Sequence, residues 1–90
     1  MRTIWKFELP IEDEVSIDMP EGAEIIHIGN QRGRLCIWAD VLTDVLSCKR
    51  NFIIVGTSDE IARKFKYLKH IGTVFFENGD IVFHVFENIE

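Results

Sequence analysis

The spacing of apolar and polar residues along this chain is typical of short strands. From Thr3 to Leu9 the two classes alternate, with large apolar side chains on one face and the charged Lys6 and Glu8 on the other. Such alternation indicates a half-buried strand. Further strands are expected where β-branched and aromatic runs are bounded by turn residues, at 14–18, 24–28, 34–39 and 51–56.

The last long apolar stretch, residues 72–86, is predicted to form the centre of the fold. Two apolar runs flank Asn78-Gly79, a dipeptide that readily adopts the two positive φ angles of a type I′ hairpin turn. Consecutive residues of both runs are apolar, so both faces of the hairpin are expected to be covered by other parts of the chain. The remaining strands should pack around this interior hairpin.

One helix is predicted, at about residues 59–69. Ser58 is a suitable N-cap, and Ile61, Phe65 and Leu68 recur at helical spacing. Basic residues gather toward the end of this segment, where the helix dipole favours cations.

The fold class expected is α+β in a single domain, residues 1–90. An antiparallel sheet of about seven strands should close as a sandwich or a partly open barrel, with the helix packed on it. The segment 41–47 is compatible with a helical turn or with an ordered loop. A hydrophobic fraction of 47% is typical of a globular protein. A chain this short has a small core, and association into a homo-oligomer is a common remedy.

The sequence also constrains the location of the protein. No apolar run approaches the length of a membrane span, and the N-terminus enters a strand pattern without the apolar core of a signal peptide. A soluble cytoplasmic protein is therefore expected, with no membrane partner.

Net charge argues against a nucleic-acid partner. The chain carries a net charge of −5, and residues 1–45 hold nine acidic but only four basic residues. A general nucleic-acid binder should present a basic face over much of its surface. A local anion site remains compatible with this balance.

No metal, cofactor or catalytic centre is indicated. Cys36 and Cys48 lack the spacing of a metal site and are expected to be reduced thiols. No nucleophile has a recognisable base and orienting acid nearby in the sequence, so the protein is predicted not to be an enzyme. A small hydrolase that uses His84 or His27 is the weakest alternative, because such sites can be assembled from distant residues.

Several residues are candidates for binding an anionic, nucleotide-like ligand. His84 lies on an otherwise apolar face, where its ring needs hydrogen-bond partners, and a structural role satisfied by the protein itself is the simpler reading. The cations could equally be solvated, and the tryptophans could belong to the core. The basic candidates for phosphate contacts are Arg32, Arg34, Arg50, Lys66 and Lys69, and the aromatic candidates for stacking are Trp5 and Trp38.

A resemblance to a known group of proteins adds a biological setting. The chain resembles a family of small proteins encoded by tailed phages and prophages, and the likeness runs across nearly its whole length. In that family a Val-Gly-Thr-Gly and a Tyr-Ile-Gly-Thr are typical, where this chain has Ser58 in place of the last Gly and His70 in place of the Tyr. The family supplies no catalytic residues. The segments that carry the resemblance are Thr3-Ile4-Trp5-Lys6-Phe7, Met19-Pro20-Glu21-Gly22-Ala23-Glu24-Ile25, Leu35-Cys36-Ile37-Trp38-Ala39, Arg50-Asn51-Phe52-Ile53-Ile54-Val55-Gly56-Thr57, Ile71-Gly72-Thr73 and Phe83-His84-Val85-Phe86-Glu87.

Together these observations predict a phage-type, non-enzymatic binding protein in the cytoplasm of the host cell. The leading hypothesis is counter-defence, in which the protein sequesters a small nucleotide-derived signalling molecule in a pocket between protomers. The alternative is an inhibitor that binds a host protein directly, through an exposed strand edge or the acidic N-terminal half.

Overall fold

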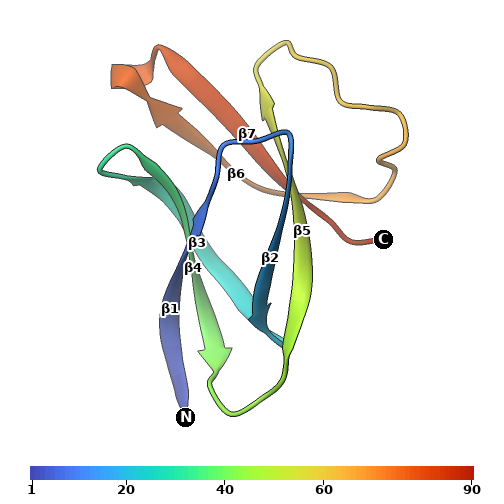
Figure 1. The fold of residues 1–90 in the computed structure, drawn as a ribbon. Coiled ribbons are helices and arrows are strands. Elements are labelled where there is room, and N and C mark those ends of the chain that lie inside the picture. The colour runs from blue at the N-terminus through green and yellow to red at the C-terminus, as the bar shows by residue number, and fades with distance from the viewer.

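The computed structural model describes residues 1–90 as seven strands in two antiparallel sheets (Figure 1). Sheet A has the order β1-β4-β3, and sheet B has the order β2-β5-β7-β6. The strands are β1 (Arg2–Leu9), β2 (Glu14–Pro20), β3 (Glu24–Gln31), β4 (Arg34–Leu42), β5 (Ser47–Gly56), β6 (Leu68–Phe76) and β7 (Ile81–Asn88). The mainly antiparallel architecture predicted from the sequence is therefore confirmed, and the sheets do not close into a barrel.

The core lies between the two sheets and is built from alternate residues of each strand. In β1 the predicted apolar face turns inward, so that Leu9 and Phe7 pack in the core, while Trp5, midway along this edge strand, stays 42% exposed. Apolar burial of this kind is the main driving force for folding. Six of the most deeply buried side chains are Leu9, Met19, Leu35, Ile37, Phe52 and Val85.

Two edges of the sheets, β3 and β6, face each other, and we call the junction between them the seam. It closes at one end, where the Asn30 Nδ2 donates a hydrogen bond to the Phe75 carbonyl oxygen at 3.1 Å. Next to this bond the side chain of Ile28 lies directly over Gly72. The other two edges, β1 and β2, have no strand beside them.

Gly72 is required for the close approach at the seam, which gives a first testable prediction. A Cβ atom at this position would overlap Cγ2 of Ile28. Gly72→Ala should therefore cost about 1–3 kcal/mol in the free energy of unfolding, as overpacked sites usually do. Urea denaturation measures this cost, and Ile28→Ala in the same chain should remove most of the additional loss. Equal losses from Gly72→Ala in both backgrounds would contradict the contact.

The β6–β7 hairpin is confirmed, but its turn differs from the expected type. Phe76 pairs with Ile81, and the residues between them form a 3₁₀ turn in which the Asp80 N–H donates to the Glu77 carbonyl oxygen at 3.1 Å. Positive φ occurs at Asn78 and Gly79 as predicted, and also at Glu77. The loop is thus four residues long instead of two, with the strand register unchanged.

The expectation that both faces of this hairpin are covered is wrong for its outer half. β7 lies between β5 and β6, and its inward residue Val85 is fully buried. On the opposite face Phe75 is 59% exposed, and no second layer covers it. Apolar content on both faces therefore does not imply burial on both faces in an antiparallel sheet.

The predicted helix at residues 59–69 is also wrong. Residues 57–67 form a loop with isolated turns, visible as the yellow and orange segment outside the sheets in Figure 1. Ser58 has φ +73°, which is not the extended conformation of an N-cap. A helix of this length is only marginally stable alone. The last two residues of the predicted helix instead belong to strand β6, where Leu68 pairs with Asn88.

The loop nevertheless uses the apolar residues that suggested a helix. Ile61 and Phe65 line a small cavity with Ile53, whose side chain is buried although it lies outside the main core cluster. The loop therefore covers part of the outer face of sheet B. The segment 41–47, for which the sequence allowed a helical turn or an ordered loop, forms the end of β4 followed by a turn. No helix in the structure has the length and apolar character needed to span a membrane.

Candidate binding site in the seam

A groove opens where β3 and β6 diverge. Its volume is about 400 Å³, within the range of small-molecule sites. Its walls come from the start of β3 and the start of β6, and its floor comes from β5 and β7. The polar residues that line it are Glu24, His27, Arg50, Lys69, His70 and Glu87.

Both walls of the groove contain a β-bulge. The pairing of β3 with β4 shifts between Ile25 and His27, and the pairing of β6 with β7 shifts between His70 and Gly72. A bulge bends its strand and redirects side chains, and bulges are frequent at sheet edges next to functional sites. Two facing bulges give a local reason why the seam opens here.

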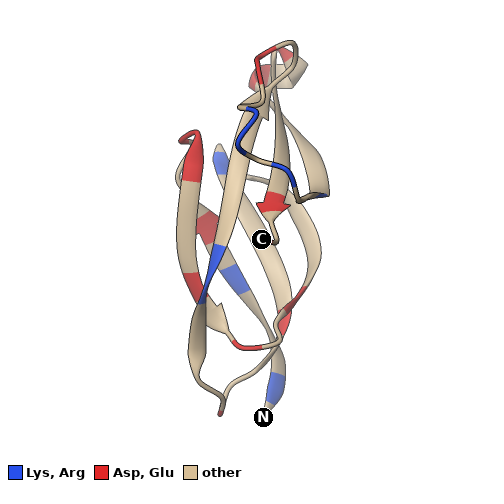
Figure 2. Ribbon diagram, turned by 90° about the vertical axis from the view of Figure 1, so that its right-hand side faces the viewer, with Lys and Arg blue, Asp and Glu red and all other residues tan.

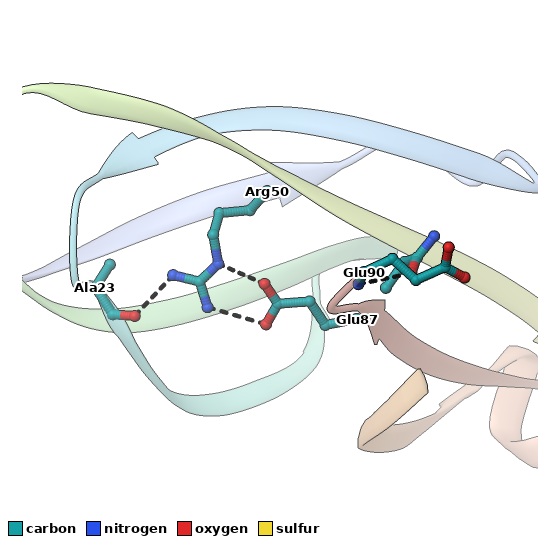
Figure 3. Close-up of polar contacts among 5 residues, drawn as sticks. Ala23, Arg50, Glu87 and Glu90 are labelled. Atoms are coloured by element: carbon teal, nitrogen blue, oxygen red, sulfur yellow. Dashed lines mark hydrogen bonds and ion pairs between the residues drawn. The ribbon is translucent and has the colours of Figure 1, made fainter. Parts of the chain in front are cut away.

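The floor of the groove is an ion pair between the β5 residue Arg50 and the β7 residue Glu87 (Figure 3). The Arg50 Nε and Nη2 donate to the two carboxylate oxygens of Glu87 at 2.5 and 2.9 Å, and Nη1 donates to the Ala23 carbonyl oxygen at 2.8 Å. The Arg50 and Glu87 side chains are 20% and 10% exposed. Arg50 therefore joins β5 to β7 within sheet B and to the turn that precedes β3 in sheet A.

This pairing keeps Arg50 charged and leaves it able to bind more. The hydrogen bonds and charge of Glu87 raise the pKa of Arg50 above its ordinary value. A guanidinium carries more N–H donors than these three bonds use. Nη1 and Nη2 therefore each keep a hydrogen that a ligand oxygen could accept.

The rim of the groove adds the cation of Lys69 and two histidines, whose rings lie on the outer faces of the sheets. The Lys69 ammonium group forms no hydrogen bond or ion pair within the protein, and this side chain lies on β6 beside the groove. The His27 ring lies against Trp38, with centroids 5.5 Å apart, and the His70 ring lies against Phe86 at 5.2 Å. The groove also contains the carboxylates of Glu24 and Glu87 beside the cations Lys69 and Arg50, so it holds charges of both signs.

The cations of the groove could hold an anion. A ligand oxyanion could take hydrogen bonds from the Lys69 ammonium group and the free guanidinium hydrogens of Arg50. No group of three or more His, Cys, Asp or Glu side chains in the structure is arranged to hold a metal ion.

The structure brings two of the eight predicted site residues, Arg50 and Lys69, together in the groove. Arg32 and Arg34 lie together in a separate hollow of about 430 Å³ on sheet A, which is lined by charged and polar residues alone. The other basic positions are spread over both sheets and the 57–67 loop, as Figure 2 shows. Lys66 lies in this loop, and Arg32 is exposed in the β3–β4 turn with φ +55°. Neither Lys66 nor Arg32 lines the groove.

Trp38 and Arg34 lie on the outer face of sheet A, which carries exposed ion pairs. The Arg34 Nη1 lies 3.0 Å from a carboxylate oxygen of Glu8 on the neighbouring strand. On the same face the Arg2 Nε and Nη2 donate hydrogen bonds to the two carboxylate oxygens of Asp40, and these bonds lower the pKa of Asp40. Trp38 therefore faces away from Trp5, which belongs to the inner face, and the two cannot hold one ligand.

His84 lies on the outer face of sheet B and does not line the groove, although it shares the Thr73 hydroxyl with His70, whose Nε2 lies 3.4 Å from this oxygen. The His84 Nε2 lies 2.7 Å from the Thr57 Oγ1, and its Nδ1 lies 3.0 Å from the Thr73 Oγ1. Both ring nitrogens are thus satisfied by neighbouring hydroxyls. This is the structural reading of a histidine on an apolar face, and no carboxylate contacts the ring.

Sequence reasoning missed the groove residues Glu24, Glu87 and His70. Glu87 was not among the candidate site residues, but it lies in β7 and is 8% exposed. A signal was present, because Glu87 continues the inward alternation of Phe83 and Val85, and an acid at an inward position needs a partner. The bulges in the two walls of the groove leave no comparable signal in the sequence.

Comparison with known proteins gave one informative result. The profile of a family described as Domain of unknown function (DUF7352) matches residues 1–90. Neither a curated protein nor a solved structure matches the chain significantly.

Proposed function

For a chain that belongs to the DUF7352 family, we propose a non-enzymatic role in which the seam groove binds a small anionic ligand. The observation that carries the proposal is the juxtaposition of Lys69, which has no partner in the protein, with the spare donors of Arg50 in a groove of about 400 Å³. Binding sites of this size use a few fixed polar groups for orientation. Arg50 is such a group, because Glu87 holds it in place before any ligand arrives.

The resemblance to phage proteins suggests which ligand to test first. A nucleotide-derived signalling molecule has phosphates that could accept hydrogen bonds from Lys69 and Arg50. Sequestering such a signal would serve a phage against host defence. In this proposal the groove belongs to one chain, and the earlier hypothesis of a pocket between protomers is not required.

Lys69→Gln tests the proposal directly. Removing one charge-assisted hydrogen bond should weaken ligand binding about tenfold. Calorimetry with cyclic nucleotides and adenosine-diphosphate-ribose derivatives as probes measures the change. Lys66→Gln is the matched control, because Lys66 lies outside the groove and has the same charge.

Two results would contradict this function. One is the absence of binding heat with every probe, using protein refolded to remove any copurified molecule. The other is an equal loss of affinity in Lys69→Gln and Lys66→Gln, which would indicate general charge attraction instead of a site.

A second candidate function is direct binding of a host protein. The outer face of sheet B favours it, because Phe75 is 59% exposed on an uncovered part of this sheet, and Tyr67, in the loop just before β6, is 62% exposed. Large exposed apolar side chains are common in protein interfaces. Phe75→Ala should abolish capture of such a partner and leave ligand binding in the groove unchanged.

A further inference from the structure

The free edge of β1 presents a regular row of unpaired backbone groups. The Thr43 N–H donates to the Met1 carbonyl oxygen at 2.9 Å, so position 1 is hydrogen-bonded toward β4. In an antiparallel pair these bonded positions alternate. The odd-numbered residues of β1 therefore bond to β4, and the N–H and C=O groups of Arg2, Ile4, Lys6 and Glu8 point away from the sheet.

We propose that β1 pairs antiparallel with β1 of a second copy of this chain. The pairing forms one continuous sheet in the order β3-β4-β1-β1-β4-β3. Free strand edges are surfaces for such addition unless they are blocked. β1 contains no proline, whereas the other free edge, β2, ends in Pro20.

One register satisfies both the side chains and the backbone. With Trp5 opposite the partner's Trp5 on the two-fold axis, Arg2 lies opposite the partner's Glu8, and Ile4 lies opposite the partner's Lys6. Opposite charges in facing positions stabilise a strand pair. The pairs Arg2–Glu8 and Ile4–Lys6 then use the backbone groups that are free in the single chain.

Neighbouring registers are disfavoured for specific reasons. A shift of one residue in each chain in one direction places Lys6 opposite the partner's Lys6, and the same shift in the other direction places Arg2 opposite the partner's Lys6. Like charges in facing positions are destabilising. A larger shift that pairs Lys6 with the partner's Glu8 brings Pro10 into a position that needs an N–H donor.

The register also accounts for the exposure of Trp5. This residue is 42% exposed on the inner face of β1, although Ala39, its partner on β4, is fully buried. Trp5 occupies a position that is not hydrogen-bonded between the two chains, where facing side chains approach most closely. The two indole rings therefore cover each other. On the outer face Arg2 lies between Asp40 and the partner's Glu8, which extends the ion pair already present.

Ile4→Pro tests the pairing without disturbing the bonds to β4. The Ile4 N–H points to the free edge, so a proline there removes only a bond between chains. Sedimentation should give twice the 10.5 kDa chain mass for the unmodified protein and the single chain mass for Ile4→Pro. Ser16→Pro is the matched control, because Ser16 holds the corresponding outward position on β2 and its variant should remain dimeric.

A charge exchange tests the register itself. Arg2→Glu and Glu8→Arg each place like charges opposite one another in a dimer of identical chains, and each should weaken association at least about tenfold. An equimolar mixture of the two variants restores both opposite-charge pairs, so it should recover a dimer that contains one chain of each. Circular dichroism should show a coupled tryptophan signal in the dimer that Trp5→Phe removes.

Three outcomes would overturn the proposal. The first is a single chain mass for the unmodified protein at the highest concentration reached. The second is a dimer that survives Ile4→Pro but not Ser16→Pro, which would place the contact on β2. The third is a mixture of the charge variants that associates no better than either variant alone.

Discussion

Arg50→Met is expected to destabilise the protein by about 3 kcal/mol, because it leaves the carboxylate of Glu87 buried without its partner. The substitution also removes the donor to the Ala23 carbonyl oxygen, and with it the polar link between the two sheets. Urea denaturation followed by circular dichroism measures the loss in the free energy of unfolding.

A double substitution separates the cost of an unpaired charge from the value of the pair. Arg50→Met combined with Glu87→Leu removes both charges, and a buried pair replaced by apolar residues is often nearly neutral. We expect the double variant to recover most of the stability. Lys49→Met is the control on the same strand, because its ion pair with Asp18 is exposed and worth less than about 1 kcal/mol. Additive losses from the two single substitutions would show that Arg50 and Glu87 act independently.

Phe52→Ala is expected to cost about 3–5 kcal/mol, the usual range for removing a buried aromatic side chain. Phe52 is 1% exposed and belongs to the core between the sheets. Phe75→Ala in the same sheet should change stability by less than about 0.5 kcal/mol, because Phe75 lies on the uncovered face. Thermal and urea unfolding of the two variants provide the comparison. Similar losses at both sites would mean that the outer face of sheet B is covered in solution.

The contrast between these two phenylalanines shows how far the sequence could lead. Both lie in apolar runs, and local pattern gives no means of telling a residue of the inner face from one of an uncovered outer face. For β1 the pattern was sufficient, because charged residues mark its outer face and the inner face follows from alternation. The hairpin turn was also predictable in place, since Asn78 and Gly79 adopt positive φ at low cost.

The predicted helix failed for a physical reason that the sequence does not display. The spacing of Ile61, Phe65 and Leu68 suits a helix, but the pairing of Leu68 with Asn88 extends β6 along β7. Hydrogen bonds to a strand that is already in place outweigh a weak local preference. The apolar residues of the loop then cover Ile53 without forming a helix.

The candidate site depended even more on tertiary structure. Arg50 and Lys69 were predicted from their charge alone, and the same reasoning selected Arg32, Arg34 and Lys66, which lie elsewhere. Arg50 and Lys69 differ from the others because they lie where β3 and β6 diverge. This divergence occurs at the two bulges and cannot be read from the composition.

By itself, the sequence determined that this chain forms antiparallel strands, how most of them alternate and where several turns fall, because these properties depend on neighbouring residues. Only the tertiary structure decided which sheet edges meet, where the seam opens, and that Glu87 would hold Arg50 at its floor. Those outcomes depend on contacts between residues far apart in the chain, whose free energies are set by packing and desolvation once the strands have assembled.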